Sequence, residues 1–434
     1  MKKFYLEKHV YLPEYNLIIN KELENLINRN KRLANCFKKR FRISIDEVEI
    51  NKIFLKRQLS RIKQITFETT QDCNLRCEYC VYNGSYFYQR RRNNKYMDFR
   101  TAKKALETII EFKKNDSHKN LVISFYGGEP LLNYNFIKEV VNYTKNYLNK
   151  KIEFSFAITT NGTLLNEKNI NFFIENNFSI LISLDGPKDI HDAKRKFVDG
   201  SGSFDKIYNN LVKIRRINKH FYETNIGFSS VWSPDLSLQK IYRFFSSDSL
   251  VKSNKVRASR VSKWKTNYFD LINYNENREY REREKVLNII KKKIERKENL
   301  LPSDYSFYLD TSKFSNLKYR RFSIFFGSCV FNNKIYVDVD GNFHICHMMN
   351  DKFPFGDIKN GFNYEMMKNI CESYLKIIRD NCFLCEFLYL CERCFVTFAK
   401  DGYFEIDEEY CNRQKKIIPI RIKKFIEHQQ NSRQ

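Results

Sequence analysis

The sequence lacks any long apolar run, because no stretch of its 434 residues approaches the roughly 20 apolar residues that span a bilayer. Its beginning also lacks the pattern of a secretory signal, since Glu7 lies inside what would be the apolar part. Hydrophobic residues still make up 42% of the chain, which argues against extensive disorder. We therefore expect a cytoplasmic protein of two or three domains with no membrane contact.

Acidic residues are few relative to basic ones. The chain has 77 Lys and Arg against 51 Asp and Glu, a formal net charge of +26. Such a field attracts polyanions or an acidic peptide. No recognised nucleic-acid-binding module accompanies basic runs such as 89–92 and 291–293, so we interpret the charge as a solvated, Lys-rich surface and expect no nucleic-acid partner.

A fourth cysteine is missing near the first cysteine group. Cys73, Cys77 and Cys80 have the spacing C-x3-C-x2-C. In a reducing compartment the 12 cysteines are expected to be metal ligands before disulfides. A [4Fe–4S] cluster normally takes four cysteine ligands. Three ligands would leave one iron open to a substrate or cofactor, which indicates catalysis.

From about residue 61 the sequence alternates short β-rich runs with amphipathic helical stretches. In one run Phe154, Phe156 and Ile158 alternate with polar or small residues, a period of two. Six such repeats predict an α/β fold with a parallel sheet and covering helices, either an open sheet or a partial barrel. The predicted strands are 65–69, 121–126, 152–158, 179–184, 225–231 and 256–261.

Polar or glycine-rich turns follow four of these strands. The three-cysteine loop follows the first strand, and the turns 127–130, 160–163 and 185–187 follow the next three. Sites in parallel β/α folds form at the carboxyl ends of strands. We therefore expect all four turns to meet at one active site.

Other segments have patterns of their own. A hairpin is predicted at 10–19 and a helix near 21–33. Residues 270–299 predict a charged helix without a clear apolar stripe, interpreted as a connector. Residues 334–346 predict a second hairpin with its turn at Asp340-Gly341. Ser203 is expected to cap the helix after it.

The cysteine loop, with Tyr79 before the last thiol, resembles that of the radical S-adenosylmethionine (radical SAM) superfamily. The resemblance implies a partial (β/α)6 TIM-like barrel. It also implies a [4Fe–4S] cluster on Cys73, Cys77 and Cys80 whose open iron binds S-adenosylmethionine, with Tyr79 near the adenine. Reductive cleavage of that cofactor would give a 5′-deoxyadenosyl radical that abstracts a substrate hydrogen.

Further residues match the same family pattern. Gly127, Gly128 and Glu129 resemble its Gly-Gly-Glu segment, which implies close backbone approach to the methionyl amine and an acceptor in Glu129. Ser183 resembles a residue that bonds the methionyl carboxylate, and Arg195 resembles its cationic partner. Without the family resemblance, the two glycines would be interpreted as a turn and Arg195 as a surface charge.

The cysteines after residue 328 resemble the SPASM extension, a C-terminal cysteine-rich domain that holds two auxiliary [4Fe–4S] clusters in peptide and protein maturases. The resemblance implies that Cys329, Cys346 and Cys394 bind auxiliary cluster I. It implies that Cys382, Cys385, Cys391 and Cys411 bind auxiliary cluster II.

The chain departs from that pattern in two places. Two residues, not three, separate Cys391 from Cys394, and Ser323 stands where some relatives have an extra cysteine nearby. Auxiliary cluster I is thus either open to a substrate thiolate or completed by Cys371. A zinc-stabilised module remains the structural alternative for the C-x2-C pairs, and Cys36 is expected to be a buried small hydrophobe.

Taken together, the resemblance implies a radical SAM/SPASM maturase of a ribosomally made precursor peptide, forming a thioether or another crosslink. A reducing donor such as flavodoxin or ferredoxin is an expected partner. The expected domains are a possible leader-recognition segment or helical cap (1–60), the barrel (61–265), a helical linker (266–325) and the auxiliary-cluster domain (326–434).

Two other functions are alternatives to that of a peptide maturase. The anaerobic sulfatase-maturing type makes formylglycine and has an Asp base after the cysteine that matches Cys346, where this chain has His347. His347 is accordingly a candidate catalytic base. A zinc- or cluster-bearing nucleic-acid-binding protein would explain the basic surface, but it leaves the matches at residues 127–129, Ser183 and Arg195 unexplained.

Overall fold

In the computed structural model the chain forms two compact units. One comprises residues 55–308 and 329–366, and the other residues 1–54, 309–328 and 367–434. The predicted domain boundaries stay predictions. The residues that the structure describes are 4–6, 9–12, 17–20, 49–113, 120–148, 152–263, 265–309, 331, 333–349, 351–382, 385, 387, 391 and 393–418.

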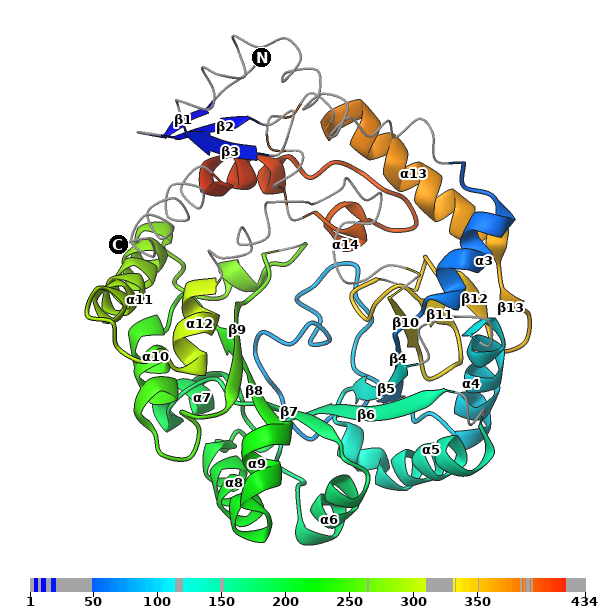
Figure 1. Ribbon diagram of the computed structural model, residues 1–434, viewed down its shortest axis with the longest axis horizontal. Helices are drawn as coiled ribbons and strands as arrows, with labels where there is room; N and C mark the ends of the chain where they lie inside the picture. Colours follow the sequence, from blue (N-terminus) through cyan, green and yellow to red (C-terminus); the bar gives the residue numbers. More distant parts are fainter. Residues whose placement is uncertain are drawn as a thin grey trace. The chain divides into compact units, whose positions relative to one another are not determined.

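The larger unit is built on a curved sheet whose parallel strands follow one another in chain order, as expected for a partial barrel (Figure 1). All six predicted strands are confirmed to within two residues at each end. They are β4 (Gln64–Thr70), β5 (Asn120–Gly127), β6 (Glu153–Thr160), β7 (Ser179–Ser183), β8 (Ile226–Trp232) and β9 (Lys255–Arg260).

Helices cover the outer face of this sheet, and the cysteine loop lies on its inner side (Figure 1). The helices of this unit are α3 (Lys52–Ser60), α4 (Phe99–Lys113), η3 (Pro130–Asn133), α5 (Tyr134–Tyr147), α6 (Glu167–Glu175), α7 (Lys188–Lys194), α8 (Phe204–Ile217), α9 (Lys219–Asn225), α10 (Leu238–Ser247), η4 (Tyr268–Asp270), α11 (Glu276–Glu295) and α12 (Pro302–Leu309).

The core between sheet and helices is aromatic. Phe67 of β4 and Phe125 of β5 each meet Phe136 of α5 edge-on, with ring centroids 6.4 Å apart. Phe178, just before β7, stacks on Phe125 and Phe156. Because strand residues alternate between faces, these rings fill the outer layer and leave the intervening polar residues facing the inside of the barrel.

The hairpin predicted at 334–346 is confirmed, and it also extends the barrel sheet. β10 (Lys334–Val337) pairs antiparallel with β11 (Phe343–His344) and parallel with β4, with Ile335 opposite Ile65. The described sheet therefore has eight strands, in the order β11-β10-β4-β5-β6-β7-β8-β9. A short pair, β12 (Gly356–Asp357) and β13 (Gly361–Phe362), follows.

The charged helix predicted within residues 270–299 is confirmed. The expectation that it lacks a clear apolar stripe is wrong. α11 buries Val286, Leu287 and Ile290, and Glu282 accepts hydrogen bonds at the start of α10, from Ser237 Oγ at 2.9 Å and the Gln239 amide at 3.3 Å. The stripe is short, so the surrounding charged residues hid it from the sequence pattern.

The smaller unit contains α13 (Tyr364–Cys382), most of whose length lies in it, α14 (Phe395–Phe398) and helical residues 408–418. The N-terminal hairpin is confirmed: β2 (His9–Leu12) pairs antiparallel with β3 (Leu17–Asn20), and β1 (Phe4–Leu6) pairs with β2. The helix predicted at 21–33, together with Cys36, lies outside the described residues.

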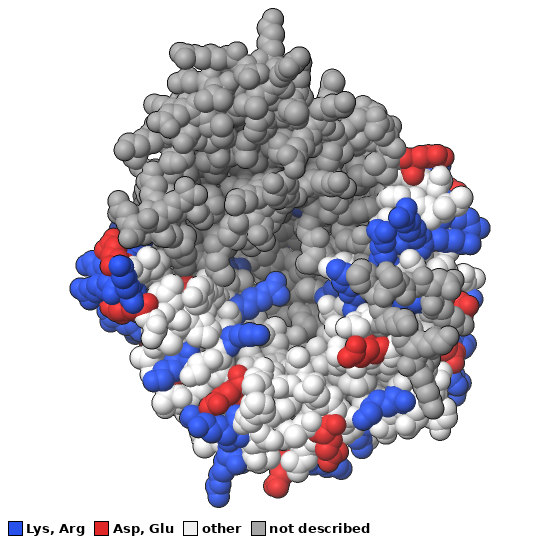
Figure 2. Space-filling view, in the orientation of Figure 1, with Lys and Arg blue, Asp and Glu red and all other residues white. Residues whose placement is uncertain are grey.

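Two global expectations can be compared with the structure. Within the part that the structure describes, no helix combines the length and apolarity needed to cross a membrane. On the face shown in Figure 2, Lys and Arg side chains are spread over the described surface with Asp and Glu between them, which agrees with a dispersed surface charge.

We predict that Phe178→Ala lowers the free energy of unfolding by about 3–5 kcal/mol, because it empties a fully buried aromatic position with four ring neighbours. Anaerobic chemical denaturation of the cluster-free protein measures this. Val198→Ala, at a position 65% exposed, is the control and should change stability by less than about 0.5 kcal/mol. Equal effects of the two substitutions would contradict the core described above.

Candidate active site

The three-cysteine loop begins where β4 ends, and residues at and just after the end of α7 hold it in place. The amide of Arg76 donates to the Lys196 carbonyl at 2.7 Å, and the amide of Glu78 donates to the Lys194 carbonyl at 3.0 Å. At the start of the loop, the Asp72 amide donates to Thr70 Oγ1 at 3.0 Å. The loop is therefore fixed by backbone contacts at both of its sides.

The structure brings the three predicted thiols together. Cys73, Cys77 and Cys80 are free and half-buried, and the charges of Cys77 and Cys80 act on Cys73. Burial raises the pKa of Cys73 to about 12 and that of Cys77 to about 11. Without a bound metal, Cys73 and Cys77 are therefore protonated at neutral pH, so a cluster would displace their protons.

Hydrogen-bond donors already point at two of these sulfurs. The Leu75 amide lies 3.4 Å from Cys73 Sγ, and Asn161 Nδ2 lies 3.9 Å from the same atom. Arg195 Nη1 lies 3.7 Å from Cys77 Sγ. Donors to cysteine sulfur are one of the means by which a protein tunes a bound iron–sulfur cluster, so the donor set fits such a group.

The Gly-Gly-Glu turn after β5 packs directly on the beginning of the cysteine loop. Amides of Gly128 and Glu129 donate to the carbonyls of Thr70 and Asp72, each at 2.8 Å. A Cβ on Gly128 would lie 1.8 Å from the Asp72 oxygen, and Gly127 has a φ of +130°. Glycine is therefore required here for contact with the cysteine loop, a reason that the family resemblance did not supply.

Glu129 is fully buried and its carboxylate is already held by three donors. Oε1 accepts from the Leu131 amide at 3.0 Å and from Thr160 Oγ1 at 2.7 Å, and Oε2 accepts from the Asn161 amide at 2.7 Å. Burial raises its pKa, while these three bonds oppose the shift. A carboxylate has about four acceptor positions, so one remains for a further donor.

The turn after β6 reaches the cysteine loop through side chains. Asn161 Nδ2 donates to Asn74 Oδ1 at 2.8 Å, and Asn74 Nδ2 donates to Thr163 Oγ1 at 2.9 Å. Thr163 in turn donates to Asn161 Oδ1 from both its amide and its hydroxyl. The sequence marked this turn only as part of the rim, and the network explains why it must be polar.

Asp185, at the end of β7, is a site residue that sequence reasoning did not single out. Its carboxylate accepts from Arg195 Nε at 2.8 Å, from the Tyr79 hydroxyl, and from the Val231 amide at 2.9 Å. Burial lowers the pKa of Arg195, but Asp185, Tyr79 and Cys77 outweigh it and raise that pKa above its usual range. The buried Asp185 carboxylate therefore positions both Tyr79 and Arg195, which are two of the predicted cofactor contacts.

Ser203 has different surroundings from those expected, while the predicted role of Ser183 is not tested. Ser203 is the N-cap residue of α8 but makes no capping bond; its hydroxyl donates to the Arg195 carbonyl at 2.8 Å and lies 3.0 Å from His191 Nε2. Ser203 therefore supports Arg195 instead of the helix. Ser183 is the last residue of β7 and half-buried, opposite Ser229, and its contact with a cofactor stays a prediction.

His347 lies inside the barrel between two tyrosines. Its ring centroid is 4.8 Å from that of Tyr126 and 6.1 Å from that of Tyr336. Burial lowers its pKa to about 3, and nearby Lys and Arg side chains add to the shift. The imidazole is therefore neutral near pH 7. Its role as a base stays a prediction.

A buried ion pair lies close to His347 and was also missed. Glu68 of β4 pairs with Arg90 and accepts from the Val339 amide at 3.2 Å, which ties the strand to the β10–β11 turn. Arg90 lies 3.7 Å above the Tyr82 ring. A charged residue within the predicted strand 65–69 was the available signal.

The four thiols predicted for auxiliary cluster II also lie together. The charges of Cys385, Cys391 and Cys411 all act on Cys382, and burial raises the pKa of Cys382 to about 12 and that of Cys411 to about 11. Among the described residues, no group of three or more His, Cys, Asp or Glu side chains is placed to hold a single metal ion. A cluster spreads its ligands over separate irons, so this spacing does not count against it.

The trio predicted for auxiliary cluster I stays a prediction, because Cys329 lies outside the described residues. Cys346 is buried after β11, and Cys394 is the N-cap residue of α14. Cys371 is fully buried in α13, and burial raises its pKa with Glu372 as the one charged group acting on it. Within the described part of the chain, nothing links Cys371 to another thiol.

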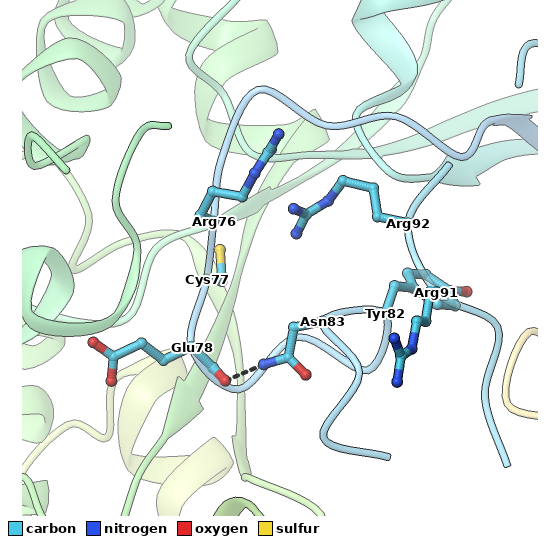
Figure 3. Close-up of a pocket in the computed structure, with 7 residues that line it drawn as sticks. All are labelled: Arg76, Cys77, Glu78, Tyr82, Asn83, Arg91 and Arg92. Atoms are coloured by element: carbon cyan, nitrogen blue, oxygen red, sulfur yellow. Dashed lines mark hydrogen bonds between the residues drawn. The ribbon is translucent and has the colours of Figure 1, made fainter. Parts of the chain in front are cut away.

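A pocket of about 370 Å³ opens beside the cysteine loop (Figure 3). Arg76, the neighbour of Cys77 in the loop, and Arg92 both lie near Cys77, while Asn83 donates to the backbone carbonyl of Glu78. Arg91 and Tyr82 complete the lining. The pocket is thus positively charged next to a predicted cluster ligand.

We predict that Gly128→Ala displaces the cysteine loop, because the new methyl group would overlap the Asp72 carbonyl. Overpacking of this kind costs about 1–3 kcal/mol, measurable by anaerobic denaturation. Reconstitution should also yield less iron per chain than wild type. Gly200→Asn, at a position with open space around it and a φ that Asn tolerates, is the control. Wild-type iron content and stability in Gly128→Ala would contradict the close approach.

Comparison with known proteins places the barrel in a family. Residues 67–228 match the radical SAM superfamily. The chain is 39% identical over 178 residues to a cysteine-type anaerobic sulfatase-maturating enzyme of Clostridium novyi, covering 41% of this chain and 46% of the relative. It is 31% identical over 249 residues to the radical SAM cyclopropyl synthase TigE of Paramaledivibacter caminithermalis, covering 54% and 49%. The chain thus spans about half the length of these relatives.

Solved structures share the fold over more of the chain. Native anSMEcpe with bound AdoMet superposes with a TM-score of 0.65 at 21% identity, over 85% of this chain and 99% of that one. Streptococcus suis SuiB bound to the precursor peptide SuiA gives a TM-score of 0.54 at 14% identity, over 89% of both chains. Residues 67–228 thus match a radical SAM domain, and the solved structures share the fold of the barrel; enzymes of the radical SAM superfamily use a [4Fe–4S] cluster and S-adenosylmethionine.

Proposed function

We propose that this chain is a radical SAM maturase that modifies a side chain of a peptide or protein. The observation that carries the proposal is the meeting of three thiols, the Glu129 carboxylate and the Asp185–Arg195 pair at the carboxyl ends of β4 to β7. A cluster and S-adenosylmethionine bound there would supply a carbon radical able to take a hydrogen atom from the substrate.

The chain's own residues bind and orient the two cofactors. Three irons of the cluster would each be bound by one thiolate, from Cys73, Cys77 and Cys80. The free acceptor position of Glu129 suits the methionyl amine, and Arg195, held by Asp185, suits the methionyl carboxylate together with Ser183. Tyr79, whose hydroxyl is tied to Asp185, offers its ring to the adenine.

The cysteine-rich region is proposed to be SPASM-like and to hold two auxiliary clusters. The grouping of Cys382, Cys385, Cys391 and Cys411 supports a closed four-thiolate site. Cys329, Cys346 and Cys394 would hold the other, with one position left for a substrate thiolate. A zinc site would predict zinc and no visible colour in anaerobically purified protein.

A ribosomally made precursor peptide is the proposed substrate, and a thioether or related crosslink the proposed product. The fold likeness to SuiB bound to its precursor peptide supports a peptide substrate. The net charge of +26 suits an acidic leader, for which residues 1–60 are the proposed recognition region. The arginine pocket beside Cys77 suits an acidic electron donor such as flavodoxin or ferredoxin.

Formylglycine formation is the second candidate, because the sulfatase-maturating relative is 39% identical over the matched residues. The chain has His347 where that type is expected to have an Asp base. A half-buried imidazole with a pKa of about 3 is a weak proton acceptor. Crosslink formation is therefore the first proposed reaction, and formylglycine formation is the second.

Anaerobic reconstitution with iron and sulfide, followed by reduction with S-adenosylmethionine, tests the proposed function. Formation of 5′-deoxyadenosine is expected, and a Cys73→Ala/Cys77→Ala/Cys80→Ala variant should form none. With a Cys-containing peptide encoded beside the gene, loss of two hydrogens without reaction toward a hydrazide supports a crosslink. A hydrazide-reactive aldehyde at one Cys or Ser supports formylglycine. If the wild-type protein does not cleave S-adenosylmethionine, the proposed function is wrong.

We predict that Asp185→Asn weakens S-adenosylmethionine binding at least tenfold, because Arg195 loses its charge partner and its fixed orientation. Equilibrium dialysis with reconstituted, unreduced protein measures this, and iron content should stay close to wild type. Asp189→Asn is the matched control, since Asp189 is exposed and pairs with Lys240 on the surface. Unchanged affinity in Asp185→Asn would show that Arg195 does not bind the cofactor.

A further inference from the structure

The inner face of β9 carries an exposed arginine, Arg257. Strand residues alternate between the two faces of a sheet, and Val256, the neighbour of Arg257, is buried on the outer face. Arg260 lies on that same outer face, where its Nη2 donates to Glu279 Oε2 of α11 at 2.7 Å. Within the described part of the chain, neither a hydrogen bond nor an ion pair holds the Arg257 side chain.

Sheet register places Arg257 at the level of the proposed cofactor site. Ser183, the last residue of β7, lies opposite Ser229 of β8, and Ser229 lies opposite Arg257. Opposite residues of neighbouring strands share one face of a sheet. This face is the inner one, because Phe228 packs outward on Phe245 of α10 with ring centroids 6.1 Å apart. Ser183, Ser229 and Arg257 therefore form one row inside the barrel.

The row faces the side of the barrel that holds Tyr126. β5 and β9 are four strands apart in the sheet, about 19 Å if the sheet were flat. The sheet is curved, and the two strands lie on opposite sides of its interior (Figure 1). The charge of Arg257 acts on Tyr126, whose ring centroid is 4.8 Å from that of His347. Arg257 and the Tyr126–His347 pair thus line the same interior.

Two other arginines of this interior already have a carboxylate partner. Arg195 pairs with Asp185, and Arg90 pairs with Glu68. S-adenosylmethionine has a single carboxylate, which the proposed function assigns to Arg195. Arg257 therefore remains for a carboxylate from another molecule that enters the barrel, and the substrate is that molecule. The planar guanidinium suits this group, because it can donate two parallel hydrogen bonds to the two carboxylate oxygens.

We infer that Arg257 binds a carboxylate of the peptide substrate close to the modified residue, and so selects peptides with an acidic residue there. The inference rests on the proposed function, because it needs a peptide inside the barrel. It goes further by naming a chemical feature of the substrate and the side chain that recognises it.

The register also limits where the carboxylate lies in the peptide. Neighbouring strands are about 4.8 Å apart, so the Cα atoms of Ser183 and Arg257 are about 10 Å apart. An extended peptide covers that distance in about three residues. We therefore expect an Asp or Glu within about three residues of the modified one, or the carboxyl terminus of the peptide at the same place.

A double-mutant cycle between enzyme and peptide tests this inference. The probe is the fluorescently labelled precursor peptide encoded beside the gene, and anisotropy measures its Kd for reconstituted, unreduced protein with bound S-adenosylmethionine. Arg257→Gln should raise this Kd at least tenfold, because a charge-assisted contact is lost. Arg257→Lys keeps the charge without the planar fork and should raise it less.

The second arm of the cycle changes the peptide. When the nearby Asp or Glu is replaced by Asn or Gln, Arg257→Gln should change the Kd less than twofold. Amidation of the carboxyl terminus in a separate peptide distinguishes the two sources of the carboxylate. A cycle that closes on either change supports the inference and identifies the source.

Lys255→Gln is the matched control. Lys255 is an exposed cation on the same face of β9, two residues nearer the amino end of the strand and opposite Gly227. It should change the Kd less than twofold for every peptide.

Three results would overturn the inference. In Arg257→Gln, equal losses for the acidic, amide and amidated peptides would show contact with the peptide main chain, and an unchanged Kd would show no contact. A tenfold weaker affinity of Arg257→Gln for S-adenosylmethionine would assign the guanidinium to the cofactor.

Product analysis separates these results from failure of the proposed function. Wild-type protein that cleaves S-adenosylmethionine but modifies no peptide refutes the proposed substrate. Wild-type protein that modifies the peptide, with a Kd that ignores Arg257 and the peptide carboxylate, refutes the recognition alone. Modification together with a loss of affinity confined to the carboxylate-bearing peptide supports both.

Discussion

The candidate active site depends on the carboxylate of Asp185. It is 1% exposed and holds Arg195, Tyr79 and the Val231 amide at once. Through these contacts the end of β7 is joined to the cysteine loop, to the end of α7 and to β8. Removing one partner of a buried charge pair costs about 3–5 kcal/mol, because the other charge remains buried. The cofactor contacts are therefore coupled to the stability of the barrel edge.

The glycine turn after β5 supplies the second constraint on the same site. Gly128 allows two loops to meet through backbone hydrogen bonds, with the Asp72 carbonyl in the place of a side chain. Glu129 then turns inward and accepts from the end of β6. The Glu129 carboxylate thus orders the turns on one side of the site and the Asp185 carboxylate orders those on the other. The three thiols lie between them.

Much of this arrangement could be predicted from the sequence, because parallel strands leave a strong local pattern. Alternating apolar residues such as Phe154, Phe156 and Ile158 located β6, and a glycine-rich or polar turn after each strand located the rim. The pairing of β10 with β4 could not be predicted, since nearly 270 residues separate Lys334 from its partner Gln64 and no local signal specifies the neighbour.

Roles that depend on a partner far along the chain were missed for the same reason. Asp185 reads as a turn residue until Tyr79 and Arg195 are placed beside it, and Ser203 reads as a helix cap until Arg195 lies within reach. The long-range contacts of Glu68 did leave a local trace, because Glu68 is a charged residue within the predicted strand 65–69. Local rules locate such residues but do not assign their partners.

The two sets of thiols share one feature of their surroundings. Each has an arginine close to a sulfur: Arg195 beside Cys77 in the barrel and Arg393 beside Cys391 in the smaller unit. In the barrel, the Asp185 carboxylate offsets the arginine. Among the described residues of the smaller unit, the charges acting on Cys382 are those of Arg393 and three other thiols. Both cysteine groups thus combine buried thiols with a nearby guanidinium, and charges and hydrogen bonds of this kind tune a bound iron–sulfur cluster.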